Sequence, residues 1–326
     1  MKTFRFAPEV IVLIFGLAIV LQPKPAKSYL VQHLPGKGSV NRARWDFSAF
    51  PVQWSINPTA SNVTGGAQVQ DVVASSFATW MAAPNTAISV SRAADNQASA
   101  PAYDGINLIC FTCATDFNSD GTLAVTFTTT ADGVGADDKH GGRSRFGGQI
   151  LDADILFNPA VKFTTDGSGS SDLQTVATHE IGHFFGLDHS AVVKATMFPF
   201  APPIERALSY DDVAAISSLY PKTSTEIPTG SISGRVTMSD GTPVFGAHVF
   251  ADSASAAAGY PGTVRKTPIG ALTLPDGTYQ IDGVPPDQYS IAAEPLDGPV
   301  SNGDVATYSP AFSKTTVQTN FTTRWH

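Results

Sequence analysis

Hydrophobic positions in the first two thirds of the chain follow helical and extended spacings in turn. From Val69 to Met81 they recur every three or four residues, which predicts an amphipathic helix. Further helices are predicted over 172–185, where Asp172 suits the first turn, and over 209–220, where Ser209 is a suitable N-cap. Short apolar runs predict strands over 45–56, 88–90, 106–111, 123–127 and 150–157. Helices and strands together indicate an α+β domain.

After residue 230 the pattern changes to short alternating strands without a helical period. Apolar runs near 232–238, 247–251, 272–274, 279–281 and 289–293 are separated by turn sequences that include Asp240-Gly241, Asp276-Gly277 and Asp282-Gly283. This pattern predicts a small all-β sandwich over 231–326. The polar stretch 222–230 predicts a linker, so we expect a chain ending near Glu226 to fold and to act without the sandwich.

The first residues have the pattern of an export signal. Lys2 and Arg5 precede an apolar run from Val10 to Leu21, and Ala26-Lys27-Ser28 offers a cleavage site between small residues. We therefore predict a signal peptide over 1–28, a short N-terminal segment over 29–43, and secretion. A single membrane anchor is the alternative, but the run is shorter than the roughly 20 residues that a span needs.

Composition indicates a folded protein and argues against some classes of partner. The chain has 326 residues, of which 42% are hydrophobic, so it can bury a core. Its net charge of -8 argues against nucleic acid or an anionic membrane as the main partner. Cys110 and Cys113 are the two cysteines. In an exported protein they favour a local disulfide, with free inert thiols as the alternative.

One short segment carries metal-site chemistry. His179 and His183 lie four residues apart, which places both imidazoles on one face of a helix. Glu180 is next to the first of them and can reach a metal-bound water without ligating. Gly186 permits a sharp turn, after which His189 can return as a third ligand. Three protein ligands with one open position are typical of a catalytic zinc.

This segment resembles the zinc-binding signature of metzincins, and with Ser190 it most resembles that of the matrixins. Residues 195–199 are similar to the Met-turn of that family, so the resemblance places Met197 beneath the zinc without ligating it. The resemblance covers 44–221. It implies a zinc metallopeptidase domain with a twisted five-stranded sheet, three helices and a cleft across the zinc.

The resemblance implies a secreted zinc endopeptidase that acts on proteins or peptides. Its zinc ligands would be His179, His183 and His189, and Glu180 would be the general base. The alternative is a non-catalytic extracellular binding or adhesion protein in which the C-terminal sandwich is the functional part.

Two further features concern the C-terminal region and possible calcium sites. Residues 231–326 resemble the carboxypeptidase regulatory-like, or transthyretin-like, β-sandwich, on the motifs 234–236, 240–244, 246–247, 276–279 and 285–286 with Tyr289. Residues 116–121 have the spacing of the first half of a calcium loop, although a polar turn explains the same residues. By analogy with the family, Asp152, Asp154 and Asn158 are further candidate calcium ligands.

Overall fold

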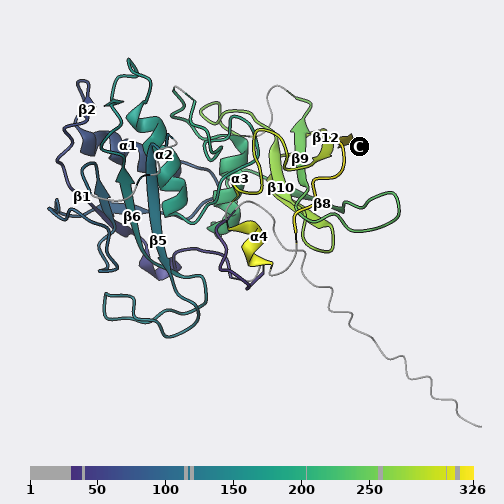
Figure 1. The fold of residues 1–326 in the computed structure, drawn as a ribbon, viewed down its shortest axis with the longest axis horizontal. Coiled ribbons are helices and arrows are strands. Elements are labelled where there is room, and N and C mark those ends of the chain that lie inside the picture. Colours follow the sequence, from purple (N-terminus) through teal and green to yellow (C-terminus); the bar gives the residue numbers. More distant parts are fainter. Residues whose placement is uncertain are drawn as a thin grey trace, which may run out of the picture.

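The computed structural model describes residues 31–38, 41–113, 117, 121–202, 204–255, 260–305, 307–312 and 316–326. The predicted signal peptide and most of the candidate calcium loop lie outside these residues. Figure 1 shows one sheet with two helices on the left and a second group of strands on the right, with α3 (Tyr210–Leu219) between them. In the part of the chain that is described, no helix is long and apolar enough to cross a membrane.

The N-terminal sheet has five strands in the order β3-β1-β4-β6-β5. The strands are β1 (Val52–Ile56), β3 (Val90–Arg92), β4 (Leu108–Cys110), β5 (Ala124–Thr130) and β6 (Ile150–Phe157). β5 pairs antiparallel with β6 and is an edge strand, and the other neighbours are parallel. A separate short pair joins β2 (Val63–Thr64) to β7 (Phe163–Thr164). Every residue of β6 is buried, as in a strand covered on both faces.

Two helices pack against each other beside this sheet (Figure 1). They are α1 (Val69–Met81) and α2 (Leu173–Phe184). The Trp80 indole N–H donates to the Thr178 carbonyl at 2.7 Å, and the Phe77 ring meets the Phe184 ring edge-on at 5.3 Å. The α+β prediction is therefore confirmed for this region, and the predicted helix over 69–81 has the predicted ends.

Side-chain caps are found where the sequence predicts the starts of α2 and α3. The Asp172 carboxylate accepts a hydrogen bond from the Thr175 amide at the first turn of α2. Ser209 and Asp212 form a reciprocal capping box at the start of α3. Each cap satisfies amides that have no partner inside their own helix.

The strand predicted over 45–56 is shorter than expected. Phe47–Ala49 form a 3-10 turn (η1), because the Asp46 side chain accepts from the Ser48 amide and caps it. Pro51 has no N–H to donate to a sheet, and β1 begins after it. Trp45 instead donates its backbone N–H to the Tyr220 hydroxyl at 2.9 Å.

Cys110 and Cys113 form a disulfide at the end of β4. The bridge lies in a small buried cluster with Leu108 and Leu156. The prediction of a local structural disulfide is confirmed, and the alternative of free thiols is wrong.

The C-terminal strands form a second, antiparallel layer. β10 (Ile269–Leu272), β9 (His248–Ser253), β12 (Tyr289–Glu294) and β13 (Arg324–Trp325) make a sheet in that order, and β11 (Thr278–Val284) pairs with β8 (Gly230–Arg235). A short helix, α4 (Tyr308–Ala311), follows β12. The expectation that this region lacks helices is wrong at α4, because four residues are too few to produce a helical period.

The turn expected at Asp282-Gly283 is also wrong. Both residues lie inside β11, where the pairing with β8 shifts register between Ile281 and Val284. Gly283 has a φ of +65°, and a Cβ added to it would lie 3.0 Å from the Cα of Ala214 on α3. The glycine therefore allows a close helix contact within a bulged strand, and the same conformational freedom makes Asp-Gly typical of turns.

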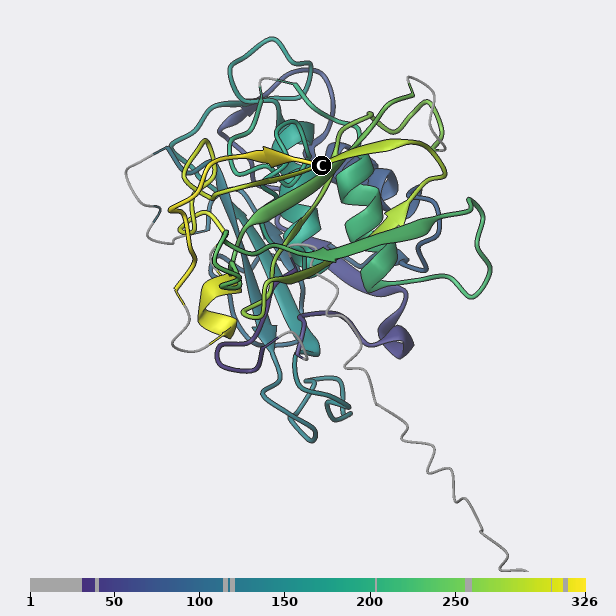
Figure 2. The same ribbon diagram turned by 90° about the vertical axis from the view of Figure 1, so that its right-hand side faces the viewer.

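The hydrophobic core continues from α3 into the C-terminal strands. Ala214 and Ile216 of α3 belong to the same buried cluster as Ile269 of β10 and Ile281 of β11. Figure 2 shows the C-terminal strands in front of the helices, in agreement with these contacts. An unbroken apolar core does not fit the expectation that a chain ending near Glu226 acts on its own.

Two buried carboxylates of β6 organise the loop before β4. Asp152 accepts from the Gly105 amide at 2.9 Å, and Asp154 accepts from the amides of Ala102 and Leu108 at 2.9 and 2.8 Å. Burial raises the pKa of Asp152 to about 7 and that of Asp154 to about 6. These carboxylate oxygens accept hydrogen bonds from backbone amides. Calcium binding at this position stays a prediction.

These shifts predict that stability falls as pH rises from about 4 to about 7. In that range the folded chain retains protons on these carboxyls that the unfolded chain has lost. The carboxylates of Asp154 and Asp104 repel that of Asp152, which also raises the pKa of Asp152. Lys139 and His140 lie nearby, beside Gly105. We expect the melting temperature of Asp152→Asn to decline less than that of the wild type across this range. Thermal melts at stepped pH test it, with exposed Asp71→Asn as the control, and parallel curves for Asp152→Asn and the wild type would contradict it.

Candidate metal centre

Helix α2 places His179 and His183 one turn apart on a single face. The helix ends at Phe184, and Gly186 follows with a φ of +92°. A Cβ added to Gly186 would lie 2.2 Å from the Ala43 carbonyl oxygen, so glycine is required for both the turn and the close approach. The chain reverses there and returns His189 towards the helix.

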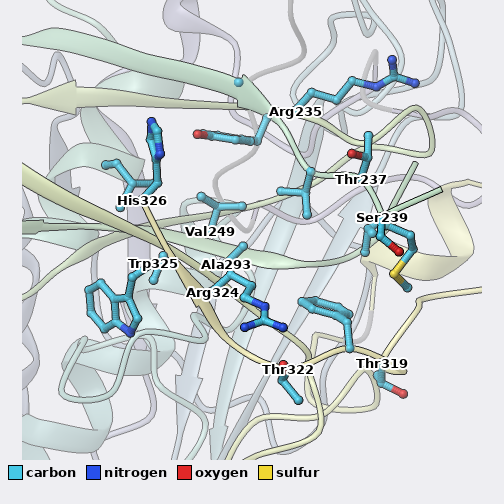
Figure 3. Close-up of a pocket in the computed structure, with 18 of the residues that line it drawn as sticks. Arg235, Thr237, Ser239, Val249, Ala293, Thr319, Thr322, Arg324, Trp325 and His326 are labelled. Carbon is cyan, nitrogen blue, oxygen red and sulfur yellow. The ribbon is translucent and has the colours of Figure 1, made fainter. Parts of the chain in front are cut away.

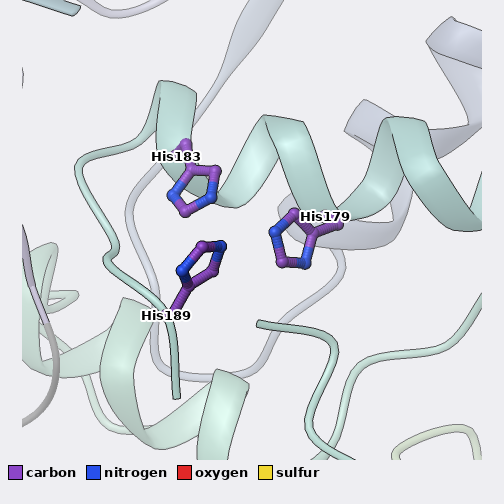
Figure 4. Close-up of side chains that lie close together, drawn as sticks. All are labelled: His179, His183 and His189. Atoms are coloured by element: carbon purple, nitrogen blue, oxygen red, sulfur yellow. The ribbon is translucent and has the colours of Figure 1, made fainter. Parts of the chain in front are cut away.

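The three imidazoles meet at one point (Figure 4). One nitrogen of each ring lies within 4.8 Å of a nitrogen of the other two, and within the described residues this is the group of side chains suited to a metal. The Nδ1 atom of each ring contacts a backbone carbonyl. The partners are Thr196 for His179 at 2.7 Å, Leu187 for His183 at 2.8 Å and Asp304 for His189 at 2.7 Å. With Nδ1–H donating, each Nε2 lone pair is left for a metal.

The electrostatic setting favours the neutral form of His179 and His183. Burial lowers the pKa of His183 to about 3 and lowers the pKa of His179 well below its ordinary value, with the neighbouring imidazoles acting in the same direction. Neutral imidazoles are the form that ligates metals. Three imidazoles without a thiolate or carboxylate ligand fit zinc with an open fourth position.

Glu180 lies on the same helix and lines the same cavity. Its carboxylate is buried and accepts from the Thr126 hydroxyl of β5 at 2.6 Å. Burial raises the pKa of this carboxyl to about 7, and the Thr126 hydrogen bond acts against that rise. The Glu180 carboxylate therefore lies in the same cavity as the three rings but is not one of the grouped metal-ligand candidates.

Met197, which the resemblance places beneath the metal, is buried. The Asp212 carboxylate accepts from the amides of Thr196 and Met197 at 2.8 and 3.1 Å. A Cβ added to Gly182 of α2 would lie 2.1 Å from the Met197 Sδ and 2.9 Å from Trp80. The methionine therefore packs on the inner side of the ligand helix.

This packing predicts a smaller cost for a change at Met197 than for one at Gly182. Met197→Leu keeps the apolar volume and should cost less than about 1.5 kcal/mol, with zinc retained. Gly182→Ala adds a methyl group to a filled contact and should cost about 1–3 kcal/mol. Denaturant unfolding of both zinc-loaded variants measures the costs. Loss of zinc from Met197→Leu would identify Met197 as a ligand and contradict the packing role.

A cavity of about 620 Å³ contains the candidate site. Its walls come from 121–126 leading into β5, from 199–201 and from the three histidines, and it also includes Gln32 and Thr307. A larger cavity of about 960 Å³ lies between β8 and the β12–β13 edge (Figure 3). The larger one has Arg235, Arg324 and Trp325 in its lining, whereas the smaller one contains the three histidines and Glu180.

The structure brings together all four residues predicted for the site. Sequence reasoning missed Thr126, Asp304 and Thr307, which contact the site from distant parts of the chain. No local signal marks them, because each acts through a hydroxyl, an amide or a carbonyl group that many other residues also carry. The contacts of the Asp212 carboxylate with the amides of Thr196 and Met197 likewise have no local signal in the sequence.

Comparison with known proteins agrees with this geometry. The sequence profile of the family described as Matrixin matches residues 44–221, more than half of the chain. The chain belongs to the matrixin family. This matrixin is similar to karilysin of Tannerella forsythia, with 45% identity over 66 residues, which cover 20% of the chain and 14% of karilysin.

Two other relatives match further parts of the chain, and the first is a metalloproteinase by name. Metalloendoproteinase 4-MMP of Arabidopsis thaliana is 36% identical over 121 residues, which cover 30% of this matrixin and 35% of the relative. Stromelysin-1 of Equus caballus is 40% identical over 77 residues, which cover 22% and 16%. The matched segments thus span between 14% and 35% of these three relatives' own lengths.

Proposed function

We propose that this matrixin is a secreted zinc endopeptidase in which His179, His183 and His189 hold the metal and Glu180 is the general base. The observation that carries the proposal is the convergence of three imidazole nitrogens within 4.8 Å, in a cavity that Glu180 also lines. A non-catalytic metal site has no need of a buried carboxylate beside its ligands, so the alternative of a pure binding protein is not favoured.

Zinc supplies Lewis acidity when bound, which lowers the pKa of a coordinated water and polarises a carbonyl oxygen. Glu180 accepts the proton of the attacking water and then delivers it to the leaving nitrogen. Thr126 orients the carboxylate through its hydroxyl. The raised pKa of Glu180 suits a group that must both take and give a proton near neutral pH.

The shape of the cleft supports cleavage inside a polypeptide. β5 is an edge strand, and the segment that leads into it forms one wall of the cavity. An extended peptide can pair with such an edge by main-chain hydrogen bonds, which places a peptide bond beside the histidines. An open cleft of this kind accepts the middle of a substrate chain.

The proposed organisation keeps the sequence boundaries. Residues 1–28 are a signal peptide, 29–43 a short N-terminal segment, 44–221 the metallopeptidase domain, 222–230 a connection and 231–326 a carboxypeptidase regulatory-like β-sandwich. The disulfide between Cys110 and Cys113 supports export to an oxidising compartment. The antiparallel pairing of β8–β13 supports the sandwich.

Hydrolysis of a casein film tests the function. We expect the full chain to clear the film, a chelator to stop clearing, and added zinc to restore it. Binding of the zinc-loaded protein to the film without any clearing would favour the non-catalytic alternative.

A further inference from the structure

We propose that Asp304 and Thr307, in the C-terminal region, are positioning residues of the metal centre. Asp304 orients the His189 ring through its backbone carbonyl, and Thr307 fixes the neighbouring Asp188 carboxylate. The inference rests on the proposed zinc function. It assigns the C-terminal region a part in building the site.

The first contact sets the orientation of the third ligand. His189 donates from Nδ1 to the Asp304 carbonyl oxygen at 2.7 Å, across 115 residues of sequence. The other two histidines use carbonyls of Thr196 and Leu187, which lie in the predicted metallopeptidase domain. A carbonyl acceptor at Nδ1 fixes the tautomer and the plane of a ligating imidazole. His189 therefore depends on the C-terminal region for a partner that the other ligands find nearby.

The second contact fixes the backbone next to that ligand. Asp188 Oδ2 accepts from the Thr307 hydroxyl at 2.5 Å and from the Thr307 amide at 3.1 Å. Asp188 Oδ1 accepts from the His189 amide at 2.8 Å. The carboxylate thus bridges Thr307 and the main chain of the third ligand.

The residue after the ligand is also connected to the C-terminal strands. Ser190 donates its hydroxyl to Asp211 at 2.5 Å, and the other oxygen of that buried carboxylate accepts from the Gly270 amide at 2.8 Å. Three consecutive residues, Asp188, His189 and Ser190, are therefore linked to the region after residue 230. The links of Asp188 and His189 are direct and that of Ser190 runs through Asp211, so the chain around the third ligand is supported from the C-terminal region.

Asp304 and Tyr308 are themselves held by neighbouring residues. The Asp304 carboxylate accepts from the amide and the hydroxyl of Ser301 at 2.8 and 2.7 Å. Tyr308 is buried, stacks on Phe245 at 5.5 Å and donates its hydroxyl to the Thr273 carbonyl. A rigid segment can hold a ligand in place, because its own ordering cost is met before the metal binds.

The test compares zinc binding by variants of the full chain. Thr307→Val removes the hydroxyl at nearly constant volume, Thr307→Ser keeps it, and exposed Thr319→Val is the matched control. We expect the zinc dissociation constant of Thr307→Val, measured by chelator competition, to rise about tenfold or more. Thr307→Ser and Thr319→Val should bind zinc as the wild type does.

Melting with and without zinc separates positioning from general stability. A positioning role reduces the zinc-induced rise in melting temperature of Thr307→Val, whereas a merely structural role lowers both melting temperatures equally. Asp304→Ala, which removes the Ser301 contacts, is the second variant if Thr307→Val does not fold. Wild-type zinc affinity in the folded variants would overturn this inference alone. A wild-type chain that binds no zinc would overturn the proposed function together with it.

Discussion

A Glu180→Ala variant should lose peptidase activity by about 10²–10⁴-fold while it keeps its zinc and its fold. The expected loss follows from the position of the carboxylate, which lines the cavity with the three histidines and is oriented by Thr126. The ligand group consists of imidazoles alone, so removal of the carboxylate leaves the metal in place. Steady-state cleavage of a short quenched peptide, at equal zinc content, measures the loss.

Glu180→Gln is the matched control for shape. The amide keeps an oxygen that can accept from Thr126, but it cannot take a proton from water. We expect Glu180→Gln to be nearly as inactive as Glu180→Ala. Turnover close to that of the wild type in either zinc-loaded variant would reject Glu180 as the base.

The double variant His179→Ala, His183→Ala should contain no zinc after purification and should show no activity. One remaining imidazole, His189, cannot replace a three-ligand site. Elemental analysis of protein purified without added metal gives the zinc content. The variant should also lose the rise in melting temperature that zinc gives the wild type.

His140→Ala controls for the loss of a histidine as such, because His140 is exposed and lies outside the ligand group. It should keep the zinc content and the activity of the wild type. Zinc retained at one equivalent by the double variant would mean that the metal binds elsewhere.

The helices and the metal ligands could be predicted because their signals are local. The period of apolar residues over 69–81 and the caps at Asp172 and Ser209 determine the helices within a few residues. The spacing of His179, His183 and His189 around Gly186 determines the ligand group in the same way. Each signal lies within about 15 residues of sequence, where helix geometry relates spacing to direction.

The features that could not be predicted depend on contacts between distant residues. The Asp304 carbonyl carries no side-chain signal for its contact with His189, which lies 115 residues away. Asp282-Gly283 is a sequence typical of turns. In the structure Gly283 instead lies in a strand, at a register shift, where α3 packs closely against it. The apolar core shared by α3 and β10 likewise has no signature in the polar stretch 222–230.

Titration of the metal-free protein with zinc, followed by cleavage of a quenched peptide, tests the proposal that this protein is a zinc endopeptidase. We expect no cleavage at the start, a linear rise on addition of zinc, and a break at one equivalent per chain. The same break should appear in binding measured for Glu180→Gln, without the rise in cleavage. Cleavage that does not depend on zinc, or one bound equivalent without any cleavage by the wild type, would contradict it.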